Sequence, residues 1–101
     1  MANTVWIGLA HVRPWATNRA LGDSSGAFVP VVGLATDADD LATLAATLLY
    51  HHQFDTVEVD DIELLSIRQK KHNVEHDLLS MAKELRDDDK VRLGAFQVYR
   101  D

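Results

Sequence analysis

Two segments in the first third of the chain have the apolar pattern of β-strands. Thr4–Val12 alternates regularly, with Val5, Ile7, Leu9 and His11 on one face and Trp6, Gly8, Ala10 and Val12 on the other. Ala27–Ala35 is a nearly continuous apolar run rich in β-branched residues, which favours a second strand. Pro30 lies inside this run and has no N–H to donate, so we expect an edge position or a bulge there.

Two further strands are predicted in the second half of the chain. Thr56–Val59 and Ile62–Ile67 both alternate, but the alternation changes phase at Asp60-Asp61, which predicts a bulge or kink. Lys90–Tyr99 is the last strand-like segment.

Helical spacing of apolar residues appears in two places. The first helix is expected to begin at Thr36 as N-cap, with Asp39 reaching back to the Thr36 amide, and to end near His52. The second is expected to begin at Asn73, a good N-cap, and to end before the acidic turn that starts at Asp87.

The resulting order is β-β-α-β-α-β in one domain spanning residues 1–101. It predicts an α+β two-layer sandwich, with a four-stranded, mostly antiparallel sheet and two helices on one face. Glycines inside three strands are expected to allow close approach of a helix or a neighbouring backbone. The second sheet face would stay apolar and uncovered, as a binding or dimer surface, unless the strand phases are wrong by one residue. The residues expected on it are Trp6, Val12, Val29, Val31, Phe96 and Val98.

Composition narrows the class of protein. The chain has 101 residues, 47% of them hydrophobic and 26% charged, which is ordinary for a globular domain. It has no cysteine, which excludes disulfides, thiolate metal sites and cysteine nucleophiles. No basic leader and no apolar stretch of membrane-spanning length are present, so we expect a cytoplasmic protein with no membrane partner.

The charge is unevenly distributed. Between Arg19 and Arg68 lie 48 residues without a single Lys or Arg, and this gap carries nine of the 16 acidic residues. The net charge of −6 is therefore concentrated in one half of the chain, and it argues against nucleic-acid binding. The nine acids are Asp23, Asp37, Asp39, Asp40, Asp55, Glu58, Asp60, Asp61 and Glu63.

Two short motifs match catalytic patterns without their required context. Gly22–Gly26 reads G-x-S-x-G, but a nucleophile elbow needs a strand before it and a helix after it. His72–His76 reads H-x-x-E-H, but a helix capped by Asn73 would leave His72 outside the helix. We therefore expect no catalytic residue, metal site or cofactor.

The function predicted from this layout is protein binding. A small acidic domain suits an inhibitor of a basic enzyme, of the bacterial immunity-protein or antitoxin type, that neutralises a toxin nuclease by electrostatic docking. Glu58, Asp60, Asp61 and Glu63 would make the charge contacts. The remaining predicted contacts are Asp37, Asp39 and Asp40 at the rim, with Trp15 and Arg13 as anchoring residues from a long loop predicted over Arg13–Gly26.

Two alternatives stay open at this point, and one of them is a structural subunit of a larger assembly. The chain could be a small α+β enzyme or ligand-binding domain, dimeric through the open sheet face. His11, His52 and the Gly8/Gly33 surface would then line a pocket.

Overall fold

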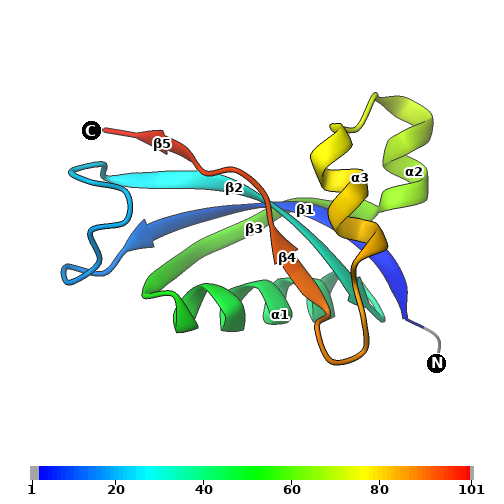
Figure 1. Ribbon diagram of the computed structural model, residues 1–101, viewed down its shortest axis with the longest axis horizontal. Helices are drawn as coiled ribbons and strands as arrows, with labels where there is room; N and C mark the ends of the chain where they lie inside the picture. The colour runs from blue at the N-terminus through cyan, green and yellow to red at the C-terminus, as the bar shows by residue number, and fades with distance from the viewer. Residues whose placement is uncertain (1–2, 101) are drawn as a thin grey trace.

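The computed structural model describes residues 3–100 and has one antiparallel sheet with three helices (Figure 1). The order across the sheet is β3-β1-β2-β4, and β5 also pairs with β2. The α+β class and the mostly antiparallel sheet are confirmed. The elements are β1 (Thr4–Pro14), β2 (Gly26–Ala35), α1 (Ala38–His51), β3 (Phe54–Leu64), α2 (Leu65–Lys71), α3 (His76–Lys83), β4 (Val91–Leu93) and β5 (Gln97–Tyr99).

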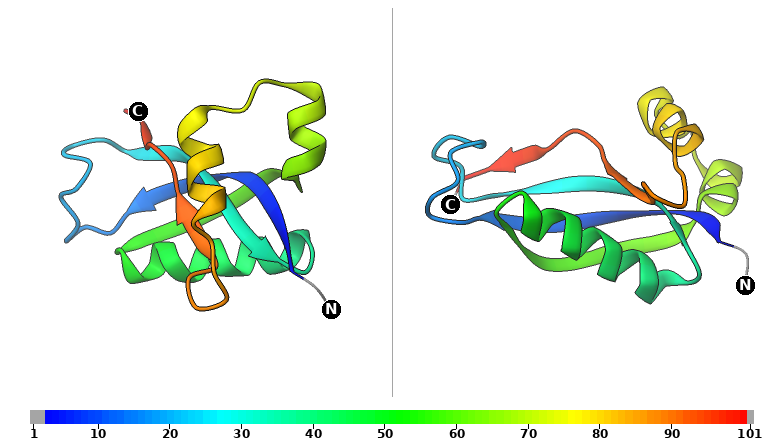
Figure 2. Two further views of the ribbon diagram at one scale, coloured as in Figure 1. Left: turned by 45° about the vertical axis from the view of Figure 1, so that its right-hand side comes forward. Right: turned by 60° about the horizontal axis from the view of Figure 1, so that its bottom comes forward.

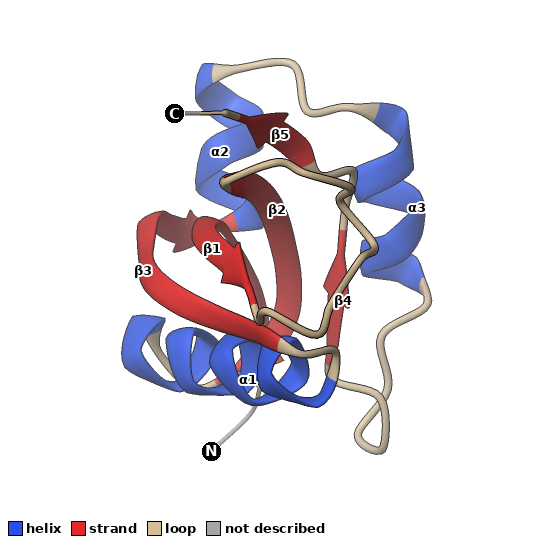
Figure 3. Ribbon diagram, turned by 90° about the vertical axis from the view of Figure 1, so that its left-hand side faces the viewer, coloured by secondary structure: helices blue, strands red, loops and turns tan. Residues whose placement is uncertain are grey.

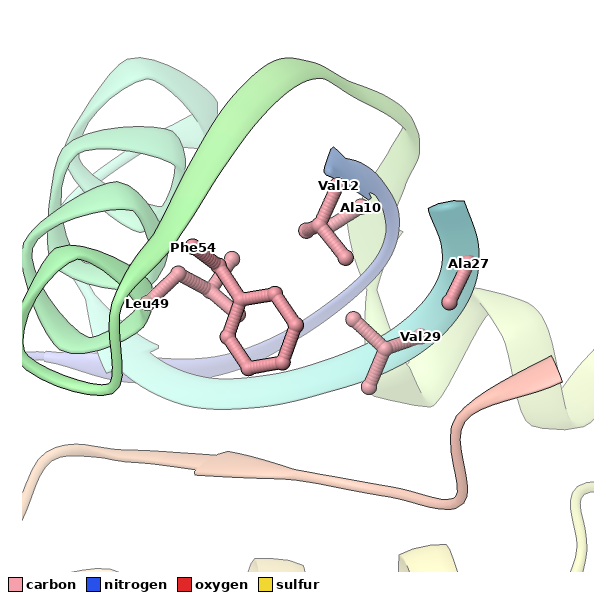
Figure 4. Packing of buried hydrophobic residues seen from close by; sticks show 6 residues of the cluster. All are labelled: Ala10, Val12, Ala27, Val29, Leu49 and Phe54. Atoms are coloured by element: carbon pink, nitrogen blue, oxygen red, sulfur yellow. The ribbon is translucent and has the colours of Figure 1, made fainter. Parts of the chain in front are cut away.

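The helices pack on both faces of the sheet, and the expectation that they share one face is wrong. One face, called here the α1 face, carries Ala10, Val12, Ala27 and Val29, which pack against Leu49 of α1 and against Phe54 (Figure 4). The other, called the second face, carries Ile7 and Val32, which pack against Leu65 of α2 and Leu78 of α3. Figure 2 shows α1 on one side of the sheet and α2 and α3 on the other.

The face predicted to be uncovered is therefore the α1 face. Val12, Val29 and Val31 are fully buried there, and Phe96 stacks on Phe54 at 5.2 Å. The predicted strand phases are correct, since β1 pairs with β2 from Thr4↔Ala35 to Val12↔Ala27 without a break. The prediction was wrong about the sheet face on which the first helix packs, because the alternation of apolar and polar residues in a strand does not indicate which face a helix will cover.

The middle of the chain differs from the prediction after residue 64. β3 is one strand with a register shift opposite Ile7 and Leu9, where Asp61 has φ +53°, so the predicted bulge at Asp60-Asp61 is confirmed. The strand predicted over Ile62–Ile67 instead ends at Leu64, and α2 begins at Leu65. The second predicted helix also starts later, at His76, with Glu75 rather than Asn73 as N-cap.

Pro30 divides the last strand. β4 pairs with Val31–Gly33 and β5 with Gly26–Phe28, so Pro30 has a ladder partner on the β1 side, Leu9, and none on the β4 and β5 side. The Pro30 carbonyl accepts from the Gly94 amide at 2.7 Å, but proline has no N–H to return the bond. The predicted edge position or bulge at Pro30 is wrong, because β2 lies between β1 and β4 and its register with β1 is unbroken. The effect of Pro30 is instead a split of the neighbouring strand into β4 and β5.

The start of α1 is displaced by one residue from the prediction. Asp37 is the N-cap and accepts from the Asp40 amide at 2.8 Å. The Asp40 carboxylate in turn accepts from the Thr36 amide at 2.9 Å, the role that was predicted for Asp39. The predicted end is confirmed, because His52 is the C-cap.

Close approach explains the strand glycines, as predicted. A Cβ on Gly33 would lie 2.6 Å from Leu41 Cδ1 of α1, and one on Gly8 would lie 3.1 Å from Ile62 Cγ1. The two glycines lie under packed side chains and do not form an accessible surface.

Candidate functional site

Half of the second face has no helix over it. α2 and α3 lie over the half that carries Ile7 and Val32. The rest of this face runs toward the Pro14 end of β1, and Figure 3 views the molecule from that end. Among the described residues no helix packs there, so the strands expose their side chains. We call this region, around His11, Phe28 and Tyr99, the open half.

Three rings form the centre of the open half. The His11 and Phe28 rings are stacked, with centroids 4.6 Å apart and planes 18° apart. His11 Nε2 and the Tyr99 hydroxyl are hydrogen-bonded at 2.6 Å, with the donor set by the histidine tautomer. Phe28 is nevertheless 40% exposed. A partly exposed aromatic cluster on a sheet face is a surface that a partner can cover.

Acidic side chains border this cluster on β3. Cross-strand pairing places Glu58 opposite His11 and Asp60 opposite Leu9, and it places Asp55 opposite Arg13. Glu58 and Asp60 are exposed, and neither forms an ion pair within residues 3–100. The open half therefore combines exposed rings with carboxylates that have no counter-charge.

Glu63, which was also predicted to contact the partner, differs from Glu58 and Asp60 in forming ion pairs within the chain. Its carboxylate pairs with Arg68 Nε and, at 2.8 Å, with Lys71 Nζ, and both cations lie on α2. The hydrogen bonds from Lys71 and then Arg68 hold the pKa of Glu63 below its ordinary value. Arg68 also donates to the Asp61 carbonyl at 2.8 Å. Glu63 thus attaches α2 to β3, and its charge is already compensated within the chain.

The predicted rim acids do not join the open half. Asp37, Asp39 and Asp40 stand at the start of α1, which packs on the α1 face. Asp37 and Asp40 use their carboxylates to cap this helix. The structure thus separates the acidic stretch of the sequence into groups with different surroundings.

Trp15 and Arg13 also occupy different environments. Trp15 Nε1 donates to Asp55 Oδ1 at 3.1 Å, and the Trp15 ring meets Tyr50 edge-on with centroids 5.1 Å apart. These contacts join Trp15, which follows β1, to α1 and β3 at the end of the sheet. Arg13 is exposed and borders the open half opposite Asp55.

His11 and His52 are not brought together. His11 lies on the second face, whereas His52 lines a mainly apolar pocket of about 350 Å³ on the side of the α1 face. The prediction that a single pocket lies near both histidines is therefore wrong. The other residues lining the His52 pocket are Ala20, Leu21, Phe54, Leu93 and Phe96.

The two catalytic-looking motifs lack the geometry that their chemistry requires. Gly22–Gly26 leads from a loop into β2 and is not followed by a helix. His72 is the C-cap of α2 and His76 is the first residue of α3, so the two histidines share no helix face. No group of three or more His, Asp or Glu side chains in residues 3–100 is placed to hold a metal ion.

Sequence reasoning missed three residues of the open half: Phe28, Tyr99 and Asp55. Strand alternation could have placed Phe28 beside His11, because both occupy the face of Ile7 and Val32. Tyr99 had no comparable signal, since its position depends on the pairing of β5 with the start of β2.

Comparison with protein-family models, with curated proteins and with solved structures found no match. None of the helices in residues 3–100 is both long enough and apolar enough to cross a bilayer.

Proposed function

We propose that this protein is a small acidic binding module that docks a basic protein partner on the open half of its sheet. An inhibitor of the immunity-protein or antitoxin type would bind a toxin nuclease in the bacterial cytoplasm in this way. The observation that carries the proposal is the position of Glu58 and Asp60, which form no ion pairs in the described chain, on the sheet face that also carries the exposed ring of Phe28, with His11 between Glu58 and Phe28.

The composition of the open half supports a protein partner. Interfaces concentrate binding energy in aromatic residues near the centre and place charged residues at the rim. Here His11, Phe28 and Tyr99 form the centre, and Glu58 and Asp60 form one border. The net charge of −6 would steer a cationic partner toward the protein.

A second copy of the chain fits the open half less well. Two copies meeting through this region would bring Asp55, Glu58 and Asp60 of both into one interface, against one Arg13 from each. Like charges across an interface are unfavourable. The charge layout therefore favours a basic partner over the homodimer.

The test begins with a tagged pull-down from native lysate at low and high salt, with bound proteins identified by mass spectrometry. The affinity of the captured partner is then measured for the E58K/D60K variant and for D87K/D88K. The latter makes the same charge change at exposed positions of the α3–β4 turn. We expect a loss of about 100-fold or more for E58K/D60K, and a much smaller change for the control.

Asp61 is a poor position for this test. Its φ of +53° is tolerated by aspartate but strained in a longer side chain, so lysine there would change the backbone as well as the charge.

The proposal is wrong if both double variants weaken binding equally, or if E58K/D60K binds normally.

For the alternative of a ligand-binding domain or small enzyme, the pocket to test is the one that His52 lines, which has apolar walls and a histidine at its border. A ligand bound there would raise the melting temperature by mass action. A thermal-shift panel of small metabolites, with His52→Ala as the control, tests it.

A further inference from the structure

We infer that the open half receives an arginine side chain of the basic partner, with the guanidinium between the His11 ring and the Glu58 carboxylate. This inference rests on the proposed function and identifies the partner group that the site fits.

The strand order creates the position for this side chain. β1 lies between β2 and β3, so His11 has Phe28 on one side and Glu58 on the other. One face of the His11 ring is stacked on Phe28. The other face is therefore directed toward β3, where Glu58 is the cross-strand partner. A flat cation placed there would contact a ring on one side and a carboxylate on the other.

Guanidinium fits this position better than ammonium does. It is planar, stacks on ring faces, and presents paired N–H donors that match a carboxylate. The hydrogen bond between His11 and Tyr99 fixes the ring against which it would stack. Asp60 follows Glu58 by two residues and adds negative charge beside Leu9, on the same side of β3.

The chain's own arginines leave this position available. Arg13 lies opposite Asp55, and the pair Val12↔Thr56 separates it from the His11↔Glu58 pair. Arg68 is bound to Glu63, and Arg92 pairs with Glu84 and Asp89. Among residues 3–100 no cation forms an ion pair with Glu58.

The test compares two peptides of equal charge, one of alternating glycine and arginine and one of alternating glycine and lysine. Each is titrated into the ¹⁵N-labelled full chain and followed by NMR. We expect the arginine peptide to shift the amides around His11, Phe28 and Glu58 and to bind about five-fold more tightly than the lysine peptide.

Two variants at one position isolate the ring. His11→Leu and His11→Phe both lose the hydrogen bond to Tyr99, but only His11→Phe keeps an aromatic face. We expect the preference for arginine to persist in His11→Phe and to disappear in His11→Leu. Glu58→Gln should weaken binding of both peptides.

Equal affinity for the two peptides would overturn the arginine inference, as would shifts that avoid the open half or no binding of either peptide. The proposed function is tested separately, by the affinity of the captured partner for the E58K/D60K variant. If the affinity of the partner depends on Glu58 and Asp60 but the two peptides bind equally well, the partner would dock through a basic surface without a stacked arginine.

Discussion

The second face of the sheet has two halves built by the same three strands, and the two halves differ in the burial of their side chains and in the pairing of their charges. In the covered half, Ile7 and Val32 are buried under Leu65 and Leu78. In the open half, Phe28 is 40% exposed, although it occupies the same strand face as Val32. The strands supply a face along their whole length, and the helices that follow β3 decide which part of it remains accessible.

The acids of β3 show the same division. Glu63 lies at the covered end and is bound by two cations of α2. Glu58 lies at the open end and has no ion pair within the described chain. Two glutamates on one strand face therefore differ in their surroundings, because only Glu63 is next to a helix that carries cations.

The largest expected contrast is in packing. Leu78→Ala removes a buried side chain under α3 and should lower the free energy of unfolding by about 2–5 kcal/mol. Phe28→Ala removes a partly exposed ring from the open half and should cost about 1–2 kcal/mol. Urea denaturation of both variants measures the difference. Equal losses would mean that Phe28 belongs to the core and is not a binding residue.

Gly26→Ala should have the next largest effect. The new Cβ would lie 2.5 Å from the Tyr99 hydroxyl and 2.7 Å from the Val12 carbonyl oxygen, so Tyr99 would have to move away from His11. We expect a loss of about 1–3 kcal/mol from overpacking. Loss of the NMR signature of the His11–Tyr99 hydrogen bond reports the displacement.

Tyr99→Phe is the matched control for that variant, because it removes the hydrogen bond to His11 without a clash. Its cost should be about 0.5–1.5 kcal/mol. If Tyr99→Phe destabilised the protein as much as Gly26→Ala, the glycine would not be needed for close packing.

The smallest effect concerns acid stability at the covered end. A carboxyl whose folded pKa is lowered contributes stability above its ordinary value, here 4.5, and this stability is lost as the pH falls through the folded pKa. Glu63→Gln should therefore lower stability at neutral pH slightly and flatten its decline below about pH 4.5. Glu58→Gln removes the same charge at a position that forms no ion pair within residues 3–100, and it serves as the matched charge control. Thermal unfolding across the acid range compares the two.

Part of the candidate site could be predicted from the sequence. The acidic stretch indicated Glu58 and Asp60, and strand alternation assigned His11 to a face. The same stretch also indicated Glu63, Asp37 and Asp40, which ion pairing and helix capping satisfy within the chain. A run of acids in the sequence does not distinguish these cases, because the distinction depends on which cation or amide lies beside each carboxylate.

Local rules of backbone geometry and side-chain periodicity were enough for several features of this protein. They gave the phases of β1 and β2, the bulge at Asp60-Asp61 and the end of α1 at His52, because each depends on neighbours in the chain. The tertiary structure alone decided that α1 and the later helices cover opposite faces, and that Tyr99 reaches His11 across 88 residues. These outcomes depend on contacts between distant segments, for which periodicity carries no signal, and the open half exists only as their result.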